Sequence, residues 1–156
     1  MYSNELVCCI LDFLDENLNR KISIEEIACK FYYNRYYIMK LFKKELGVTT
    51  LTYMNRMRII HSIRDIQLFN YSLTKVAIRN GFYSLEYFSE VFHKIMGVSP
   101  SIYQTYCNCR FRLSSQELES IGENWANLSS FVNFIEAYKK NKKPRSIPVL
   151  KRYIFH

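Results

Sequence analysis

The sequence contains one stretch twice, fifty residues apart. The copies run over Phe42–Tyr53 and Phe92–Tyr103, and each has a glycine at its sixth position. An aliphatic residue followed by alanine precedes each copy, at Ile27-Ala28 and Val76-Ala77. A repeat of this length indicates a duplicated supersecondary unit. The pattern of helix, tight turn, amphipathic helix and glycine stop predicts that this unit is a helix-turn-helix.

Composition favours a compact and mostly helical fold. The 156 residues are 49% hydrophobic and 16% aromatic, enough to bury a core, and only four glycines and three prolines interrupt them. This length suits one domain or two very small ones. We therefore predict an all-α fold of two helix-turn-helix units joined by a long helix, with a C-terminal extension.

The first unit is expected over residues 20–50, after an amphipathic helix over residues 4–18. Ser23 begins a capping box for a short helix that ends near Phe31. Asn34 is the predicted N-cap of a second helix, which Gly47 ends. The positions expected to be buried are Leu6, Ile10, Phe13, Leu14 and Leu18 in the first helix, Ile24, Ile27 and Ala28 in the second, and Ile38, Leu41, Phe42 and Leu46 in the third.

A linking helix over residues 51–68 and a second unit over residues 72–104 follow. Ser72 and Ser84 are the predicted N-caps, Asn80-Gly81 the turn and Gly97 the stop. A last short helix begins at Ser99-Pro100. The linking helix should turn Tyr53, Met57, Ile60, Ser62, Ile63 and Ile66 inward, and the helix after Ser84 should bury Phe88, Val91, Phe92 and Ile95.

Residues 5–106 resemble the DNA-binding domain of the AraC/XylS family of transcription regulators. The matching segments are Ile24–Ala28, Leu41–Gly47, Tyr53 with Arg58, Val76-Ala77, Asn80–Phe82, Tyr87–Lys94, Gly97–Pro100 and Tyr103. The resemblance implies a double helix-turn-helix domain over residues 1–106 that binds double-stranded DNA. In such motifs the second helix enters the major groove.

On the second helix of the first unit, several residues remain outside once the buried stripe is removed. They are Arg35, Tyr36, Met39, Lys40, Lys43 and Lys44, with Tyr37 at the margin. The resemblance implies that Tyr36, Met39 and Lys40 contact bases. Lys40 can donate to guanine, and Tyr36 and Met39 can pack on thymine methyl groups. The alternative is an ordinary solvated basic face.

The corresponding helix of the second unit is acidic. Its outward residues are Leu85, Glu86, Ser89, Glu90 and His93, with Lys94 beside them. The family commonly has a basic or amide residue where Glu90 stands. Glutamate can accept from cytosine N4 but repels phosphates. This helix should bind DNA weakly, contact a cytosine, or leave the bases alone.

Phosphate contacts are expected from helix N-termini and from nearby cations. The candidate N-termini are those at Ser23, Asn34, Ser72 and Ser84, and the candidate cations are Lys43, Lys44, Lys94 and Arg56. Arg58 matches a family position on the linking helix. We expect Arg58 to be structural, paired with a carboxylate or with a helix end.

Residues 107–156 lie beyond the resemblance. A heptad stripe predicts a helix over residues 118–138, which either pairs with a second copy or packs on its own chain. The stripe is Leu118, Ile121, Trp125, Leu128, Val132 and Ile135. A basic run over residues 139–152 either adds phosphate contacts or is a solvated end, and residues 147–155 could form an edge strand.

The chain has a net charge of +8, which indicates a polyanionic partner. Residues 1–104 contribute +3 of this charge and residues 105–156 contribute +5. The three histidines form no metal or protease motif, and the five cysteines are expected to be mostly buried thiols. No catalysis, metal or cofactor is predicted. The lack of a long apolar run and of a signal sequence predicts a cytoplasmic protein. With DNA as the predicted partner, we expect it to be nucleoid-associated.

The predicted function is sequence-specific binding of double-stranded DNA by a bacterial transcription regulator, with activation as the working assignment. Two recognition helices would occupy successive major-groove segments. RNA polymerase is a candidate second partner. The alternative is a helix-turn-helix scaffold that binds proteins, as a co-regulator or antagonist, which the acidic second unit and the heptad stripe motivate.

Overall fold

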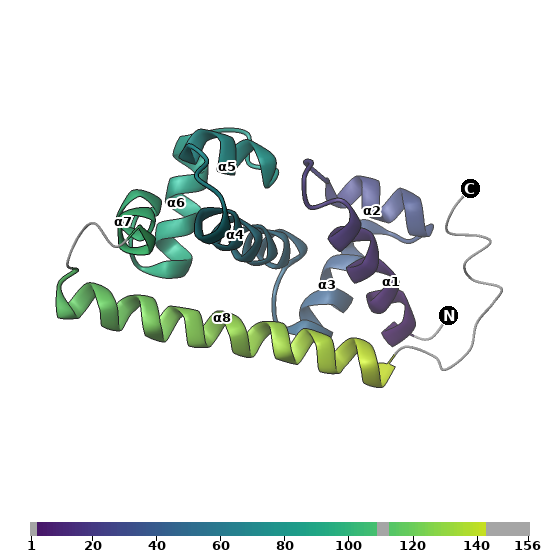
Figure 1. Ribbon diagram of the computed structural model, residues 1–156. Helices are drawn as coiled ribbons and strands as arrows, with labels where there is room; N and C mark the ends of the chain where they lie inside the picture. Colours follow the sequence, from purple (N-terminus) through teal and green to yellow (C-terminus); the bar gives the residue numbers. More distant parts are fainter. Residues whose placement is uncertain (1–2, 109–112, 143–156) are drawn as a thin grey trace.

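The computed structural model describes residues 3–108 and 113–142, which form helices joined by short turns (Figure 1). The predicted all-α fold, with two helix-turn-helix units and a long linking helix, is confirmed for these residues. The helices are α1 (Ser3–Glu16), α2 (Ile24–Phe31), α3 (Arg35–Leu46), α4 (Thr50–Leu68), α5 (Leu73–Arg79), α6 (Leu85–Met96), α7 (Pro100–Cys107) and α8 (Ser115–Lys142).

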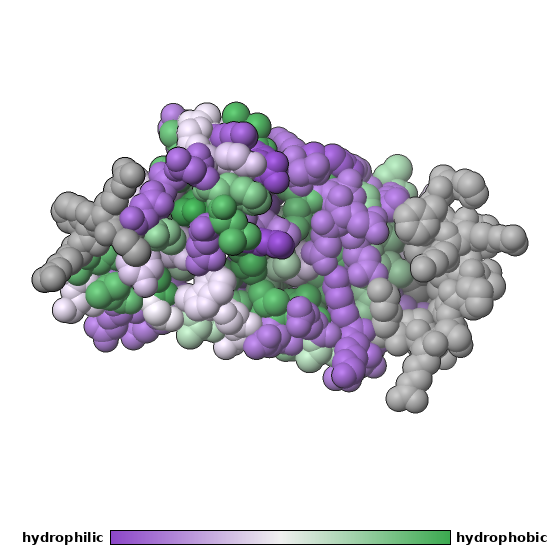
Figure 2. All heavy atoms as spheres, in the orientation of Figure 1, coloured by the Kyte–Doolittle hydropathy of each residue, from purple (hydrophilic) through white to green (hydrophobic). Residues whose placement is uncertain are grey.

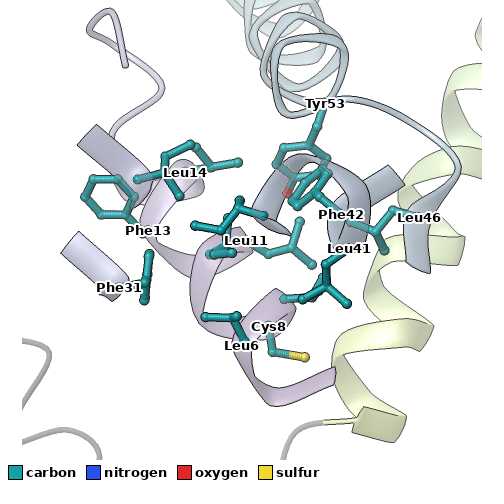
Figure 3. Packing of buried hydrophobic residues seen from close by; sticks show 14 of the residues in the cluster. Leu6, Cys8, Leu11, Phe13, Leu14, Phe31, Leu41, Phe42, Leu46 and Tyr53 are labelled. Carbon is teal, nitrogen blue, oxygen red and sulfur yellow. The ribbon is translucent and has the colours of Figure 1, made fainter. Parts of the chain in front are cut away.

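The first unit packs α1, α2 and α3 around one hydrophobic core (Figure 3). Both predicted N-caps are confirmed: Ser23 Oγ accepts from the amide of Glu26 at 3.1 Å, and Asn34 Oδ1 accepts from that of Tyr36 at 2.8 Å. The core includes Leu6, Leu11, Leu14, Ile27, Ile38, Phe42 and Tyr53. The helix α1 ends at Glu16 rather than at the predicted residue 18. The Asn17 side chain donates to the carbonyl of Phe13 at 2.8 Å just beyond this end.

The linking helix α4 passes from one core to the other. Its first turns bury Tyr53 and Met54 in the first core, and its later turns bury Ile59, Ile63 and Ile66 in the second. Because the buried side changes along the helix, one inward stripe does not describe it. The prediction that Met57 and Ile60 face fully inward is therefore wrong. Both are partly buried, and Ile59 is fully buried instead.

Arg58 on α4 joins the two units, as its predicted structural role requires. Its Nε donates to the carbonyl of Leu18 at 2.8 Å and its Nη2 to that of Arg20 at 2.6 Å. Its partners are thus backbone carbonyls after α1 and not a carboxylate. Burial lowers the pKa of this guanidinium. The turn of the second unit also lies here, since a Cβ on Gly81 would come within 2.2 Å of the Leu18 carbonyl oxygen.

The second unit packs α5, α6 and α7 around its own core. Ser72, Ser84 and Ser99 cap its three helices through their hydroxyl groups. Phe88, Val91 and Phe92 are buried as predicted. The prediction for Ile95 is wrong: it is only partly buried, and its neighbour Met96 is fully buried.

The last helix, α8, runs along both units at the lower edge of Figure 1. Its heptad stripe is split between two surroundings. Ile121 and Leu128 are buried in the second core, and Ile135 is buried in the first together with Tyr138. The other stripe positions are more open: Leu118 is 45% exposed and Trp125 is 42% exposed. The inner face of the predicted helix therefore packs on its own chain. The predicted strand over residues 147–155 lies outside the described residues.

Candidate nucleic-acid interface

The helix α3 presents a basic and aromatic face. Ile38, Leu41, Phe42 and Leu46 turn into the first core. All seven candidate residues on the other side are exposed: Arg35, Tyr36, Tyr37, Met39, Lys40, Lys43 and Lys44. Met39 is 49% exposed and Tyr36 is 64% exposed, although both carry large hydrophobic side chains. The helix α3 thus exposes three large hydrophobic side chains, including Tyr37, beside three lysines.

Local contacts position the N-terminal turn of this face. The Arg35 guanidinium donates to Glu25 Oε1 at 3.0 Å and to the Tyr36 hydroxyl at 2.8 Å, and it lies 4.7 Å from the Tyr36 ring centroid. The hydrogen bond to Tyr36, followed by that to Glu25, raises the pKa of Arg35. Tyr37 stacks on Tyr33 at 5.4 Å. Arg35 therefore orients Tyr36, and Glu25 offsets part of its charge.

The helix α6 presents an acidic face in the corresponding place. Glu86, Glu90, His93 and Lys94 are exposed, and Leu85 and Ser89 are partly buried. Its apolar side holds Phe88, Val91, Phe92 and Met96 in the second core. The structure thus leaves all the candidate residues of both units at least partly open. The two helices differ in charge as the sequence predicts.

A groove of about 480 Å³ lies between α4, α6 and α8. Glu90 and Lys94 line it from α6, and Arg56 lines it from α4. On the far side Asn124 and Asn127 line it from α8. These two asparagines were not predicted, because the heptad pattern of residues 118–138 identifies only the apolar positions of that helix. The face of the molecule drawn in Figure 2 mixes hydrophilic and hydrophobic residues.

The cations predicted to contact phosphates differ in availability. Lys43, Lys44 and Lys94 are exposed. The Arg56 guanidinium is partly buried and lies 4.4 Å from the ring centroid of Phe131 on α8. Arg56 is therefore held against α8.

Of the basic run over residues 139–152, the structure describes only residues 139–142. Lys139 is not free to bind phosphate, because its Nζ donates to Asp12 at 3.0 Å and to Asp15 at 2.6 Å. The remaining residues of the run lie outside the described residues. Phosphate binding by this run stays a prediction only for residues 140–152.

Within residues 3–108 and 113–142, no cluster of histidine, cysteine or acidic residues has the arrangement of a metal site. No helix in that part of the chain is both long and apolar enough to span a membrane. Cys8 is buried, and Cys9 and Cys107 are partly buried. Cys29 is exposed, contrary to the expectation of buried thiols, and Cys109 lies outside the described residues.

Residues 27–106 match the sequence model of the helix-turn-helix domain family. The transcriptional activator AarP of Providencia stuartii is 26% identical over 103 residues, which cover 66% of this chain and 76% of AarP. The TetD protein of transposon Tn10 from Escherichia coli is 28% identical over 95 residues, covering 61% of this chain and 69% of TetD.

Solved structures share the fold. The DNA-binding domain of AdpA, determined in complex with a target DNA, superposes with a TM-score of 0.62 at 24% identity, over 68% of this chain and 95% of that one. The C-terminal domain of AraT, a response regulator from Geobacillus stearothermophilus, gives a TM-score of 0.63 at 22% identity, over 70% and 88% of the two chains.

Proposed function

Because the chain belongs to the AraC-type family of helix-turn-helix transcription regulators, we propose that it binds duplex DNA through α3 and α6 together. The two helices would occupy successive major-groove segments on one face of the duplex, about 34 Å apart. The observation that carries this proposal is the exposed face of α3. Tyr36, Met39 and Lys40 are exposed on this face, while the other side of the helix is buried in the first core. Exposed tyrosine and methionine beside lysines suit a surface that a partner covers.

Each residue of α3 has a chemical role in this proposal. Lys40 donates to O6 and N7 of guanine, and Tyr36 and Met39 pack on thymine methyl groups. Lys43 and Lys44, one turn further along, bind phosphates and fix the register. One good base contact contributes about 1–3 kcal/mol of discrimination.

The helix α6 would contribute less to affinity and more to selectivity. Glu86 and Glu90 are exposed and would repel the phosphates that they approach. Glu90 can accept a hydrogen bond from cytosine N4. In this proposal, the favourable contact of the second half-site is with a cytosine at the position that Glu90 reaches.

The test is selection of bound duplexes from a random pool by the unmodified protein and by Lys40→Ala and Glu90→Ala. Each variant should lose sequence preference at one half-site and keep it at the other. Lys140→Ala is the matched control, since Lys140 is an exposed lysine on α8 and a phosphate contact there would carry no base preference. Unchanged base preferences in Lys40→Ala would contradict the assignment of α3.

The acidic face of α6 also favours a second candidate function, binding of a protein partner as a co-regulator or antagonist. RNA polymerase is the candidate partner on either view. Titration with random and genomic duplexes at low salt separates the two functions, because sequence-independent DNA binding is strongest there. Lack of any duplex binding under these conditions would favour the protein-binding function.

Self-association through residues 118–138 would have to use positions of α8 that remain exposed. On one side of the helix, Leu118 is 45% exposed and Trp125 is 42% exposed, whereas Leu128 is buried in the second core. Leu128→Asp would therefore unfold the chain rather than test pairing. Trp125→Glu, followed by sedimentation, is the cleaner test: a dimer that it dissociates supports pairing of α8 helices.

A DNA-binding regulator of this kind would act at the bacterial nucleoid, and activation is the proposed direction of control.

A further inference from the structure

The helix α8 is anchored in both units at once. Its N-terminal half buries Ile121 and Leu128 in the core of the second unit. Its C-terminal half buries Ile135 and Tyr138 in the core of the first unit. Leu128 and Ile135 are seven residues apart, so two helical turns, about 10.5 Å, connect the two cores. A continuous helix over so short a distance resists bending, because bending would break its backbone hydrogen bonds.

The anchor in the first unit is polar as well as apolar. The Tyr138 hydroxyl donates to Glu45 Oε2 at 2.9 Å on α3. The Lys139 amine donates to Asp12 and Asp15 on α1. Burial by itself lowers the pKa of Lys139, but its hydrogen bonds to Asp15 and Asp12 outweigh burial and raise it. This end of α8 therefore holds directly to α1 and to the recognition helix α3.

The anchor in the second unit lies against the recognition helix α6. A Cβ on Gly97, the residue after α6, would come within 2.0 Å of Ser120 Oγ and 2.9 Å of Asn124 Nδ2 on α8. Leu128 lines the groove beside Val91 and Ile95 of α6. Because α8 touches both α3 and α6, it connects them by a path that does not pass through α4.

A second connection lies at Arg58, which binds the carbonyls of Leu18 and Arg20 next to the turn at Gly81. Rotation of one unit against the other about α4 would thus have to break this contact or dislodge one end of α8. Neither connection covers the exposed residues of α3.

We propose that α8 fixes the distance and angle between α3 and α6, and so makes the spacing of the two half-sites a determinant of DNA binding. This inference rests on the proposed function. One extra base pair moves the second half-site by about 3.4 Å and rotates it by about 34° around the duplex. Two units held as one rigid body cannot follow that movement. Without α8, each unit could adjust by shifting its packing on α4, which needs no bending of that helix.

The experiment measures affinity for duplexes that carry the two selected half-sites at the selected spacing and at spacings changed by one or two base pairs. The unmodified protein should lose about tenfold or more on a change of one base pair, as for loss of base contacts in one half-site. A variant with five glycine and serine residues inserted after Ser130 should lose less than about threefold, since the insertion separates the two anchors. The same insertion after Asn108, which leaves α8 whole, should keep the penalty of the unmodified protein.

A milder variant guards against misfolding of the insertion. Tyr138→Phe with Lys139→Gln removes the polar contacts of α8 with the first unit and leaves the core filled, and it should also reduce the spacing penalty. Glu123→Gln with Glu136→Gln, at two exposed positions of α8, is its control. Equal spacing penalties in the unmodified and the two α8 variants would overturn the inference. If selection returns no two-part site at all, the proposed two-helix function fails first, and the inference fails with it.

Discussion

The repeat places a glycine at the end of each of two equivalent helices, with the same backbone conformation but different neighbours. Gly47 and Gly97 end α3 and α6, and their φ angles are 74° and 76°. An alanine at either position would adopt the left-handed conformation, which costs about 1 kcal/mol for a residue with a Cβ. A Cβ on Gly47 has no heavy atom within 4 Å, whereas a Cβ on Gly97 meets Ser120 and Asn124 of α8.

We therefore expect Gly47→Ala to lower the free energy of unfolding by about 1 kcal/mol, from backbone strain alone. Gly97→Ala should lower it by about 2–3 kcal/mol, because the same strain is joined by overpacking against α8. The backbone contribution cancels in the difference between the two variants. The remaining difference in unfolding free energy, about 1–2 kcal/mol, measures how closely α8 packs against the end of α6.

Urea unfolding followed by far-ultraviolet circular dichroism gives both free energies, and an unchanged m-value shows that the comparison is valid. Ser120→Ala removes the Oγ and leaves the Ser120 Cβ 3.4 Å from the new methyl group. The double variant Gly97→Ala, Ser120→Ala should therefore recover about 1 kcal/mol relative to Gly97→Ala. Equal losses in the two glycine variants, or no recovery in the double variant, would refute this placement of α8.

Three further changes test other contacts. Arg58→Met should lower the free energy of unfolding in urea by about 2–3 kcal/mol, because two carbonyls lose charge-assisted hydrogen bonds. Arg64→Met, at an exposed position of α4, is the control. A loss under about 0.5 kcal/mol in Arg58→Met would contradict its role in joining the two units. Tyr32 has a φ of 60° and is 93% exposed. Tyr32→Gly should therefore raise the free energy of unfolding by about 0.5 kcal/mol, because the relief of backbone strain exceeds the effect of the added entropy of the unfolded chain. Tyr32→Ala should give no such gain. Lys139→Gln should cost about 0.5–1 kcal/mol at pH 7. The pKa of Lys139 is raised in the folded chain. The difference in unfolding free energy between the unmodified protein and Lys139→Gln should therefore stay constant below the ordinary pKa of lysine and shrink as pH rises through the folded value. An increase of this difference with pH would contradict the assigned contacts.

The helix-turn-helix units could be predicted from sequence because their signals are local. Caps such as Ser23 and Asn34 and the stop at Gly47 depend on residues within one or two turns. The exposed face of α3 also follows locally, since removing the buried stripe leaves the outward residues. Predictions that depend on long-range packing were less successful. Ile59 replaces Ile60 on the buried side of α4 because that helix serves two cores, which periodicity in one segment does not reveal.

The position of α8 could not be predicted for the same reason. A heptad stripe indicates one apolar face but not its partner, and here Leu128 and Ile135 pack in different cores. The contact between Lys139 and Asp12 joins residues more than a hundred positions apart. A lysine run in the sequence gives no sign of such an ion pair. The partners of Arg58 were likewise beyond local patterns, since they are loop carbonyls about forty residues away.

The acidic face of α6 acquires a physical role once the two units are held together. If α3 and α6 were free to move apart, α3 could bind any duplex by its lysines while Glu86 and Glu90 stayed away from phosphates. If both units are fixed by α8 and Arg58 as proposed, binding of α3 would bring Glu90 to the duplex as well. Its repulsion of phosphates would then oppose binding, and a base pair that offers cytosine N4 to Glu90 would turn the approach into a hydrogen bond. Rejection of wrong sites by an unpaired charge is a recognised route to specificity. On the proposed mode of binding, the acidic helix and the rigid connection would therefore act together, lowering general DNA affinity and favouring selection of one site.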